Sequence, residues 1–416
     1  MPNYKRTRLA CYSTYLTMAS AFVLPPILFN TFHEMYGISY TLLGTLVLIN
    51  FCTQLAIDLV FTFFSRFFNI RIVSRVMPLI TTSGLALYAL IPHLFPEFAY
   101  VGLVLGTLIF SVAAGLSEVF VSPLIAALPS DNPEREMSFL HSLYGFGVVS
   151  SVLIASLYFL FFSTDQWMYL TLFFALLPIL SSVLFSISPI PDMSSEAPQK
   201  GSAKKRHFGL FLCVVCIFLG GAAENTMTNW ISGYMETALG LPKSVGDVLG
   251  LAIFALLLAM TRMLYAKFTP SITKTLLFSM IGATVCYIVT GLSSSVVLSF
   301  LACILIGMFS SMLWPGTLIL MEENLPSLGV TAYALMAAGG DLGSSVAPQL
   351  LGIVVDKIAV TEFAREMSLS SGISPEEIGL KIGMLIAAIF PLLGVFVVLY
   401  MRKYFSSKKR RKEAES

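Results

Sequence analysis

Four carboxylates stand inside long apolar runs of this sequence, and the chemistry open to them is proton binding. They are Asp58, Glu118, Glu224 and Asp341. An ionised carboxylate in a bilayer core is costly unless it faces an internal cavity or a partner, so an acid there indicates function. Protonation removes that cost, because it removes the charge. We therefore predict that these four residues are candidates for proton coupling.

Small and polar residues accompany two of these acids at helical spacing. The stripe that contains Glu118 also holds Ser111, Gly115 and Ser122. The stripe that follows Asp341 holds Ser344, Ser345, Pro348 and Gln349. Residues three and four apart share one face of a helix. Such faces indicate contact with protein or water rather than lipid, and the glycines at 339, 340 and 343 allow close helix approach.

The stretch GGAAENTMTNWISGY, residues 220–234, carries the densest set of polar side chains. At about 100° per residue its polar side chains occupy one arc of about 140°: Glu224, Asn225, Thr228, Asn229 and Ser232. Trp230 and Tyr234 lie together beside this arc. Amides and carboxylates bond hydroxyls, and aromatic faces stack on the apolar side of a sugar ring. We predict a cavity-lining helix that binds a polar solute and can bend at Gly220-Gly221.

Further candidates for substrate binding lie on other segments: His141, Tyr144, Trp314 and Gln349. Each has a structural alternative, since a histidine can sit neutral and hydrogen-bonded and an aromatic ring can simply pack. Arg66 and Arg262 are candidates for a gate or latch, and Asp58 could pair with Arg66 instead of moving protons. Arg262 lies two turns from the end of its helix, so no cation is expected at mid-membrane. That absence favours neutral or cationic cargo.

Composition identifies the elements that must position these residues. The chain is 56% hydrophobic and 12% charged, against about 45–50% and about 25% in soluble domains. A spanning helix needs about 20 mostly apolar residues. Twelve segments qualify: 9–32, 40–65, 72–94, 98–128, 138–162, 166–188, 208–237, 245–268, 273–292, 295–321, 331–358 and 379–401. The sequence therefore predicts an all-α membrane protein with twelve transmembrane helices.

The basic residues predict the orientation of these helices. Of the 25 lysines and arginines, all but Lys243, Lys357, Arg365 and Lys381 fall on the side of the two termini. Basic residues are enriched in cytoplasmic connections, so both termini are expected inside, in a cytoplasmic (inner) membrane. The polar segment 191–206 divides the spans into two six-helix bundles, 1–190 and 207–416 with its basic tail. This layout is typical of a two-bundle transporter.

Several other functions lack support in the sequence. Cys213 and Cys216 form a CxxC without a second pair or histidine cluster, so no metal or cofactor is expected. No nucleotide-binding loop or nucleophile–base pair indicates an enzyme, and no nucleic-acid partner is expected. The expected partners are a small neutral solute, protons and the lipid bilayer, and the chain is expected to work as a monomer.

The segments that carry the intramembrane acids and polar side chains resemble the major facilitator superfamily and, within it, the fucose–proton symporter group. GLSEVFVSPLIAAL places Glu118 on that group's glutamate, and GGAAENTMTNWISGY places Glu224, Trp230 and Tyr234 on its polar residue, Trp and Tyr. Further matches follow in order: Arg262, Trp314-Pro315, Gly339-Gly340, Pro348, Gly352 and Asp356. Two positions depart from the pattern, because Ala21 replaces an acid before a Leu-Pro step and Ser65 an expected aspartate.

The resemblance implies two pseudo-symmetric bundles that rock about a midplane site, which is alternating access. With Ala21 in the first helix, coupling must rest on Glu118, Glu224 or Asp341, or be absent. The leading hypothesis is proton-coupled symport of a neutral polar solute, such as a monosaccharide. A proton-driven exporter of cationic or amphipathic compounds is the alternative, although HSLYGFGVVSSV lacks the Gly-Pro pattern of drug antiporters. A non-transporting scaffold would not need polar stripes on several helices.

Overall fold

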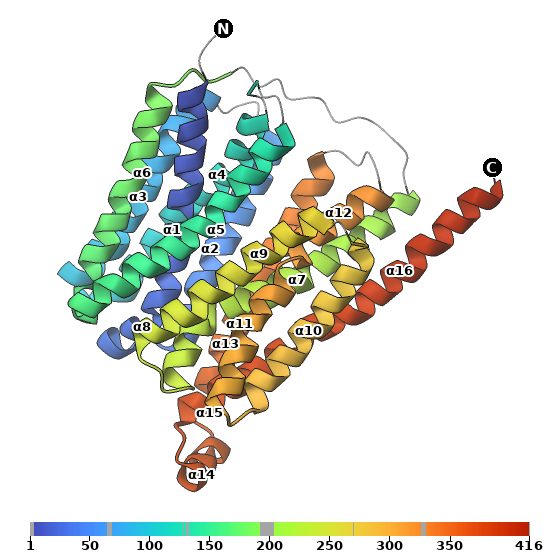
Figure 1. Cartoon of the computed structure of the whole chain (residues 1–416). Coiled ribbons are helices and arrows are strands. Elements are labelled where there is room, and N and C mark those ends of the chain that lie inside the picture. The colour runs from blue at the N-terminus through green and yellow to red at the C-terminus, as the bar shows by residue number, and fades with distance from the viewer. Residues whose placement is uncertain are drawn as a thin grey trace. The chain divides into compact units, whose positions relative to one another are not determined.

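The computed structural model describes residues 4–64, 69–126, 128–129, 133–191, 204–268, 270–325 and 330–415, and every regular element among them is a helix (Figure 1). Twelve helical segments are long and apolar enough to cross a membrane, as predicted. Helices suit a bilayer because all their backbone hydrogen bonds are made within the segment. The predicted fold class is confirmed.

The chain forms two compact units. The first comprises Met1–Glu196 and Leu241–Ala255, and the second comprises Ala197–Gly240 and Leu256–Ser416. The first unit therefore includes the start of the eighth span, which the sequence-based division assigned to the second bundle. The predicted linker, 191–206, lies mostly outside the described residues.

Six spans build most of the first unit: α1 (Lys5–Tyr36), α2 (Tyr40–Phe64), α3 (Ile70–Leu94), α4 (Ala99–Ala126), α5 (Pro133–Phe161) and α6 (Trp167–Ser186). The short 3-10 helices η2 (Pro96–Phe98) and η3 (Thr164–Gln166) precede α4 and α6. Helix α1 packs against α5 and α6, while α3 packs against α4 and α6. The short helix α8 (Lys243–Val245) and the π-helix η4 (Gly246–Ala252) complete the unit and pack against α5.

The second unit contains the other described helices: α7 (Lys204–Thr237), most of α9 (Ile253–Phe268), α10 (Ile272–Leu292), α11 (Val296–Ser310), α12 (Leu313–Asn324), α13 (Val330–Ala359), α14 (Glu362–Ser371), α15 (Pro375–Ala387) and α16 (Ile389–Glu415). The break expected between the predicted spans 273–292 and 295–321 is present. The Ser295 hydroxyl caps α11 by accepting a hydrogen bond from the backbone N–H of Leu298 at 3.4 Å, which satisfies a donor that the first turn leaves unpaired.

Glycines hold α7 and α13 together in the second unit. These helices are far apart in the sequence and lie side by side. A Cβ atom at Gly343 would collide with the carbonyl oxygen of Phe218, and one at Gly221 would lie 2.6 Å from the carbonyl oxygen of Gly340. Small residues allow such backbone approach, which drives helix association in lipid. Gly220-Gly221, predicted as a place to bend, lies within the continuous helix α7 and serves close packing.

We expect Gly343→Ala to destabilise the protein by about 1–3 kcal/mol, because the new methyl group would force α7 and α13 apart. The matched control is Gly316→Ala in α12. There a Cβ atom would meet the flexible end of Ile272, 2.9 Å away, which can move. Denaturant titration in detergent would measure both variants, and equal stability of the two would contradict this account of the α7–α13 contact.

Candidate functional site

The middle of α7 keeps one accessible strip, and that strip is polar. From Leu219 to Met235 every residue is buried except Glu224, Asn225 and Thr228, which are half-buried. These three lie within about 100° of arc on the helix. Many exposed residues elsewhere are large and apolar, as expected against lipid. A polar accessible strip therefore indicates a face that meets water or a polar ligand, and we call Glu224, Asn225 and Thr228 the α7 strip.

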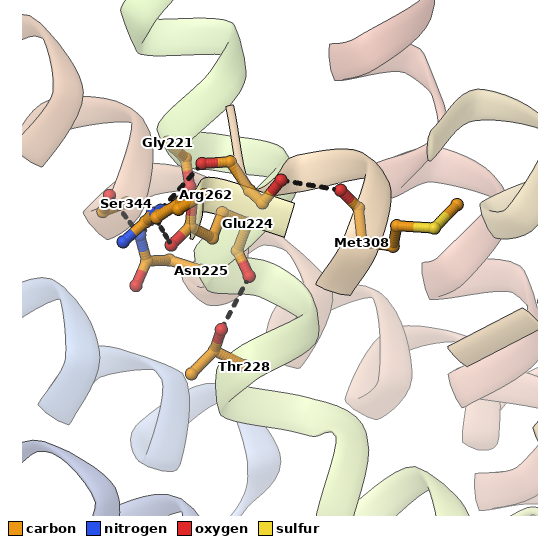
Figure 2. A network of polar contacts seen from close by, with 8 residues as sticks. Gly221, Glu224, Asn225, Thr228, Arg262, Met308 and Ser344 are labelled. Atoms are coloured by element: carbon orange, nitrogen blue, oxygen red, sulfur yellow. Dashed lines mark hydrogen bonds and ion pairs between the residues drawn. The ribbon is translucent and has the colours of Figure 1, made fainter. Parts of the chain in front are cut away.

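Arg262 of α9 reaches the α7 strip. Its Nη2 lies 3.2 Å from Oε1 and 3.4 Å from Oε2 of Glu224, and its Nε donates to the carbonyl oxygen of Ser311 at 2.9 Å (Figure 2). The Glu224 and Arg262 side chains are 17% and 38% exposed. The expectation that no cation lies near the middle of the spans is therefore corrected. The long arginine side chain extends from near the helix end to the midpoint of α7.

The amide of Asn225 connects α7 to α13. Its Nδ2 donates to Oγ of Ser344 at 2.8 Å and to the carbonyl oxygen of Gly221 at 3.3 Å (Figure 2). The Thr228 hydroxyl donates to the carbonyl oxygen of Glu224 at 2.9 Å. These bonds use the donors and leave the Asn225 amide oxygen and the Thr228 hydroxyl lone pairs as acceptors. The α7 strip therefore offers hydrogen-bond acceptors, and the neighbouring Arg262 of α9 offers hydrogen-bond donors.

The remaining polar and aromatic candidates of α7 turn into the protein. Trp230 is 1% exposed and its indole N–H donates to the carbonyl oxygen of Pro348 at 3.1 Å. Tyr234 is fully buried and its hydroxyl donates to the carbonyl oxygen of Thr290 at 2.6 Å. Asn229 is also buried and donates to the carbonyl oxygen of Asn225 at 2.8 Å. This geometry favours packing for Trp230 and Tyr234, and their predicted stacking role stays a prediction.

Three other candidates belong to the second unit. Trp314 is half-buried, and its ring covers Gly340, where a Cβ atom would collide with it. Gln349 is half-buried in α13. Asp341 is 4% exposed in α13, one turn from Ser344. Asp341 therefore stands near the bond that joins Asn225 to Ser344, on the same helix.

Two of the predicted acids meet in the first unit. Carboxylate oxygens of Asp58 on α2 and Glu118 on α4 lie within 4.8 Å of one another. Asp58 is 6% exposed, whereas Glu118 is exposed. The two helices approach closely at Gly115, where a Cβ atom would lie 3.2 Å from Cα of Gln54. Two carboxylates this close repel each other when both are ionised, so the pair favours binding a proton on one of them.

A buried polar network beside this pair joins Ser111, which the Glu118 stripe predicted, to Asn50 and Gln54, which were not predicted from the sequence. Ser111 donates to Oδ1 of Asn50 at 2.6 Å, and Nε2 of Gln54 lies 3.2 Å from the same oxygen. Gln54 is 1% exposed. Asn50, Gln54 and Asp58 follow one another at intervals of four, so their spacing was the signal that could have revealed them.

Two candidates lie beyond what the structure describes, and a third packs against a neighbour. Arg66 falls outside the described residues, as does the side chain of His141 in α5. Tyr144 is half-buried, and its ring meets Phe22 edge-on with 6.1 Å between centroids. The predicted latch of Asp58 with Arg66 and the transport role of His141 therefore stay predictions.

We expect a double-mutant cycle on Glu224→Gln and Arg262→Gln to give a coupling energy of at least about 0.5 kcal/mol, because each single change leaves the other charge without its partner. Denaturant titration in detergent would supply the free energies of unfolding. Glu224→Gln combined with Arg402→Gln, at an exposed arginine of α16, is the control and should be additive. An additive Glu224–Arg262 cycle would show that their contact does not stabilise the fold.

Comparisons with known proteins agree with this architecture. A bacterial homologue of the human lysosomal transporter Spinster, solved in an inward-facing and unoccupied conformation, is 12% identical with a TM-score of 0.76, over 97% of this chain and 98% of that chain. A D-xylose–proton symporter is 15% identical with a TM-score of 0.70, over 94% and 97%. The E. coli fucose:proton symporter is 15% identical with a TM-score of 0.55, over 94% and 99%.

At these identities the likeness establishes the fold alone. No curated protein sequence matches the chain. The family model for the Major Facilitator Superfamily matches residues 10–348, which is most of the sequence. The chain therefore belongs to the Major Facilitator Superfamily, whose members are membrane transporters.

Proposed function

We propose that this transporter moves a small neutral polar solute of the monosaccharide class, together with protons, by alternating access. The observation that carries the proposal is the α7 strip, where the accessible residues of a membrane helix are Glu224, Asn225 and Thr228. Carboxylate, amide and hydroxyl groups bond the many hydroxyls of a sugar. The same strip would give an apolar solute nothing to replace the water that it displaces.

Neutral cargo fits the charges around the strip. The Glu224 carboxylate and the Arg262 guanidinium contact each other, so the pair carries no net charge. An anionic or a cationic solute would have to break this ion pair to gain a counter-charge, which leaves the other partner unpaired. A neutral solute can accept bonds from Arg262 and donate bonds to Glu224 while the pair persists. The sequence favoured neutral or cationic cargo because no cation was expected at mid-membrane. Here the ion pair itself supports a neutral solute.

The structural relatives are consistent with this class and do not select it. They include proton symporters for D-xylose and fucose, but also a nucleoside transporter and a peptide transporter. Nucleosides share the hydroxyl groups that the α7 strip would bind. Substrate screening therefore has to include both classes.

Proton coupling is assigned to Asp58 and Glu118 in the first unit. Glu224 contacts Arg262 in an ion pair, so it already has a counter-charge. The Asp58–Glu118 pair instead brings two like charges together, and Glu118 is accessible for proton exchange. If solute binds better to the protonated protein, the two ligands stabilise the same state and move together. Asp341 is the remaining candidate, and Arg262 acts as the partner of Glu224.

The membrane placement forms part of the same proposal. Twelve spans put both termini on one side of the bilayer. The distribution of basic residues assigns that side to the cytoplasm and the protein to the cytoplasmic membrane. We propose that a single chain is the transporting unit.

Thermal-shift screening of the purified protein should identify the cargo class. We expect monosaccharides to raise the melting temperature, because a ligand that binds only the folded state stabilises it. Nucleosides, amino acids and cationic dyes are the other arms of the screen. Stabilisation by cationic dyes alone would support the drug exporter and overturn the sugar proposal. Glu224→Gln should reduce the shift given by the stabilising sugar.

Replacing the accessible acid of the carboxyl pair should separate coupling from binding. We expect Glu118→Gln to abolish proton-driven uptake while it preserves solute exchange, because an amide cannot take up a proton. Uptake into proteoliposomes with and without a pH gradient would measure both. Glu97→Gln, at an exposed acid of η2, is the matched control. A pH-gradient response of Glu118→Gln equal to that of the control would rule out Glu118 as the coupling residue.

A further inference from the structure

The eighth membrane span begins with an ion pair that was not predicted from the sequence. This span covers Gly246–Tyr265, and the chain enters it through Lys243. Asp247 is fully buried and its Oδ2 lies 3.9 Å from Nζ of Lys243, whose side chain is 11% exposed. Burying an ion pair costs desolvation energy, and removing one partner would leave the other charge buried without a counter-charge. The pair is therefore not explained by stability alone.

The Lys243 side chain also contacts a second helix. Its Nζ donates to the carbonyl oxygen of Ile27 on α1. Helix α5 packs against both α8 and η4 in the same unit. The start of the eighth span is therefore fastened to α1 by a hydrogen bond and to α5 by packing, while the ion pair with Asp247 holds the ammonium in place.

The backbone changes its winding between this contact and the rest of the span. Residues Gly246–Ala252 form the π-helix η4, and α9 continues from Ile253. Helical turns of this type are rare and occur frequently at functional sites, where they displace the helix axis. The boundary between the two units follows at Ala255 and Leu256. One continuous span therefore belongs to both units, and its irregular winding lies just before the point where it passes from one to the other.

We propose that Lys243 and Asp247 form a latch that holds the start of the eighth span on the first unit, and that η4 is the hinge of that span. When the two units change their relative positions during alternating access, the end that carries Lys243 leaves α1 and η4 bends to allow this movement. Release of the Lys243–Ile27 hydrogen bond is then a step in opening the side of the protein opposite the termini. This proposal requires the transporter fold and does not depend on the identity of the solute or on proton coupling.

Distance measurements between spin labels can test the latch. Labels at Glu34→Cys, at the end of α1, and Ser294→Cys, between α10 and α11, would report on the two units in a background without the native cysteines. Both positions follow odd-numbered spans, so twelve-span topology places them on the side opposite the termini. We expect Lys243→Met and Asp247→Asn to raise the ratio of long to short distances by about tenfold, within the range of known coupling energies. Lys243→Arg should keep the distribution of the unmodified protein.

A local ion pair provides the matched control. Lys381 contacts Glu377 at 3.0 Å within α15, with the same spacing of four residues and a similarly covered side chain. Lys381→Met should leave the distances unchanged. An unchanged or shortened distance in Lys243→Met, or an equal shift in Lys381→Met, would overturn the latch. If Asp247→Asn fails to fold, Lys243→Met and Lys243→Arg still decide the question, because Lys243 is not fully buried.

Discussion

The cost of placing polar groups in hydrocarbon governs the interior of both units. Because a bilayer core offers no water, each buried donor, acceptor or charge needs a partner from the chain itself. Trp230 reaches the carbonyl oxygen of Pro348, Tyr234 that of Thr290, and Tyr287 that of Ala223. These bonds join helices that are distant in the sequence. Polar side chains that remain accessible despite this pressure, such as those of the α7 strip, keep acceptor atoms that a ligand from outside the chain can bind.

The number of spans and the polar face of α7 could be predicted from the sequence because both depend on local patterns. Length and hydropathy define a spanning helix, and a period of 3.6 residues places Glu224, Asn225 and Thr228 together. The same pattern could not tell which neighbours of the arc point into the protein. Trp230 and Tyr234 lie beside the polar arc on the helical wheel, yet α13 and α10 cover them. Which helix covers a face is decided by packing, and packing is not a property of one helix.

Contacts between helices explain the other differences. The reach of Arg262 to Glu224 depends on how closely α9 approaches α7, and the meeting of Asp58 with Glu118 depends on Gly115. Asp247 escaped notice because it stands at the beginning of an apolar run, where an acid usually lies in the interface. Its complete burial follows from the position of η4 against α5. A sequence shows the polar groups that need partners, whereas the helix arrangement decides the pairs.

Glu224 and the Asp58–Glu118 pair have different surroundings, and this difference is the basis for dividing the proposed roles. In the second unit the Arg262 guanidinium contacts Glu224, so this acid has a counter-charge beside the α7 strip. In the first unit two carboxylates lie within 4.8 Å, so their charge changes with the bound proton. The first helix carries Ala21 at the position where the sequence resemblance implies an acid, so it supplies no carboxylate there. A proton site on α2 and α4 would therefore lie in the same unit as Ala21, while the solute-binding side chains lie on α7 in the other unit.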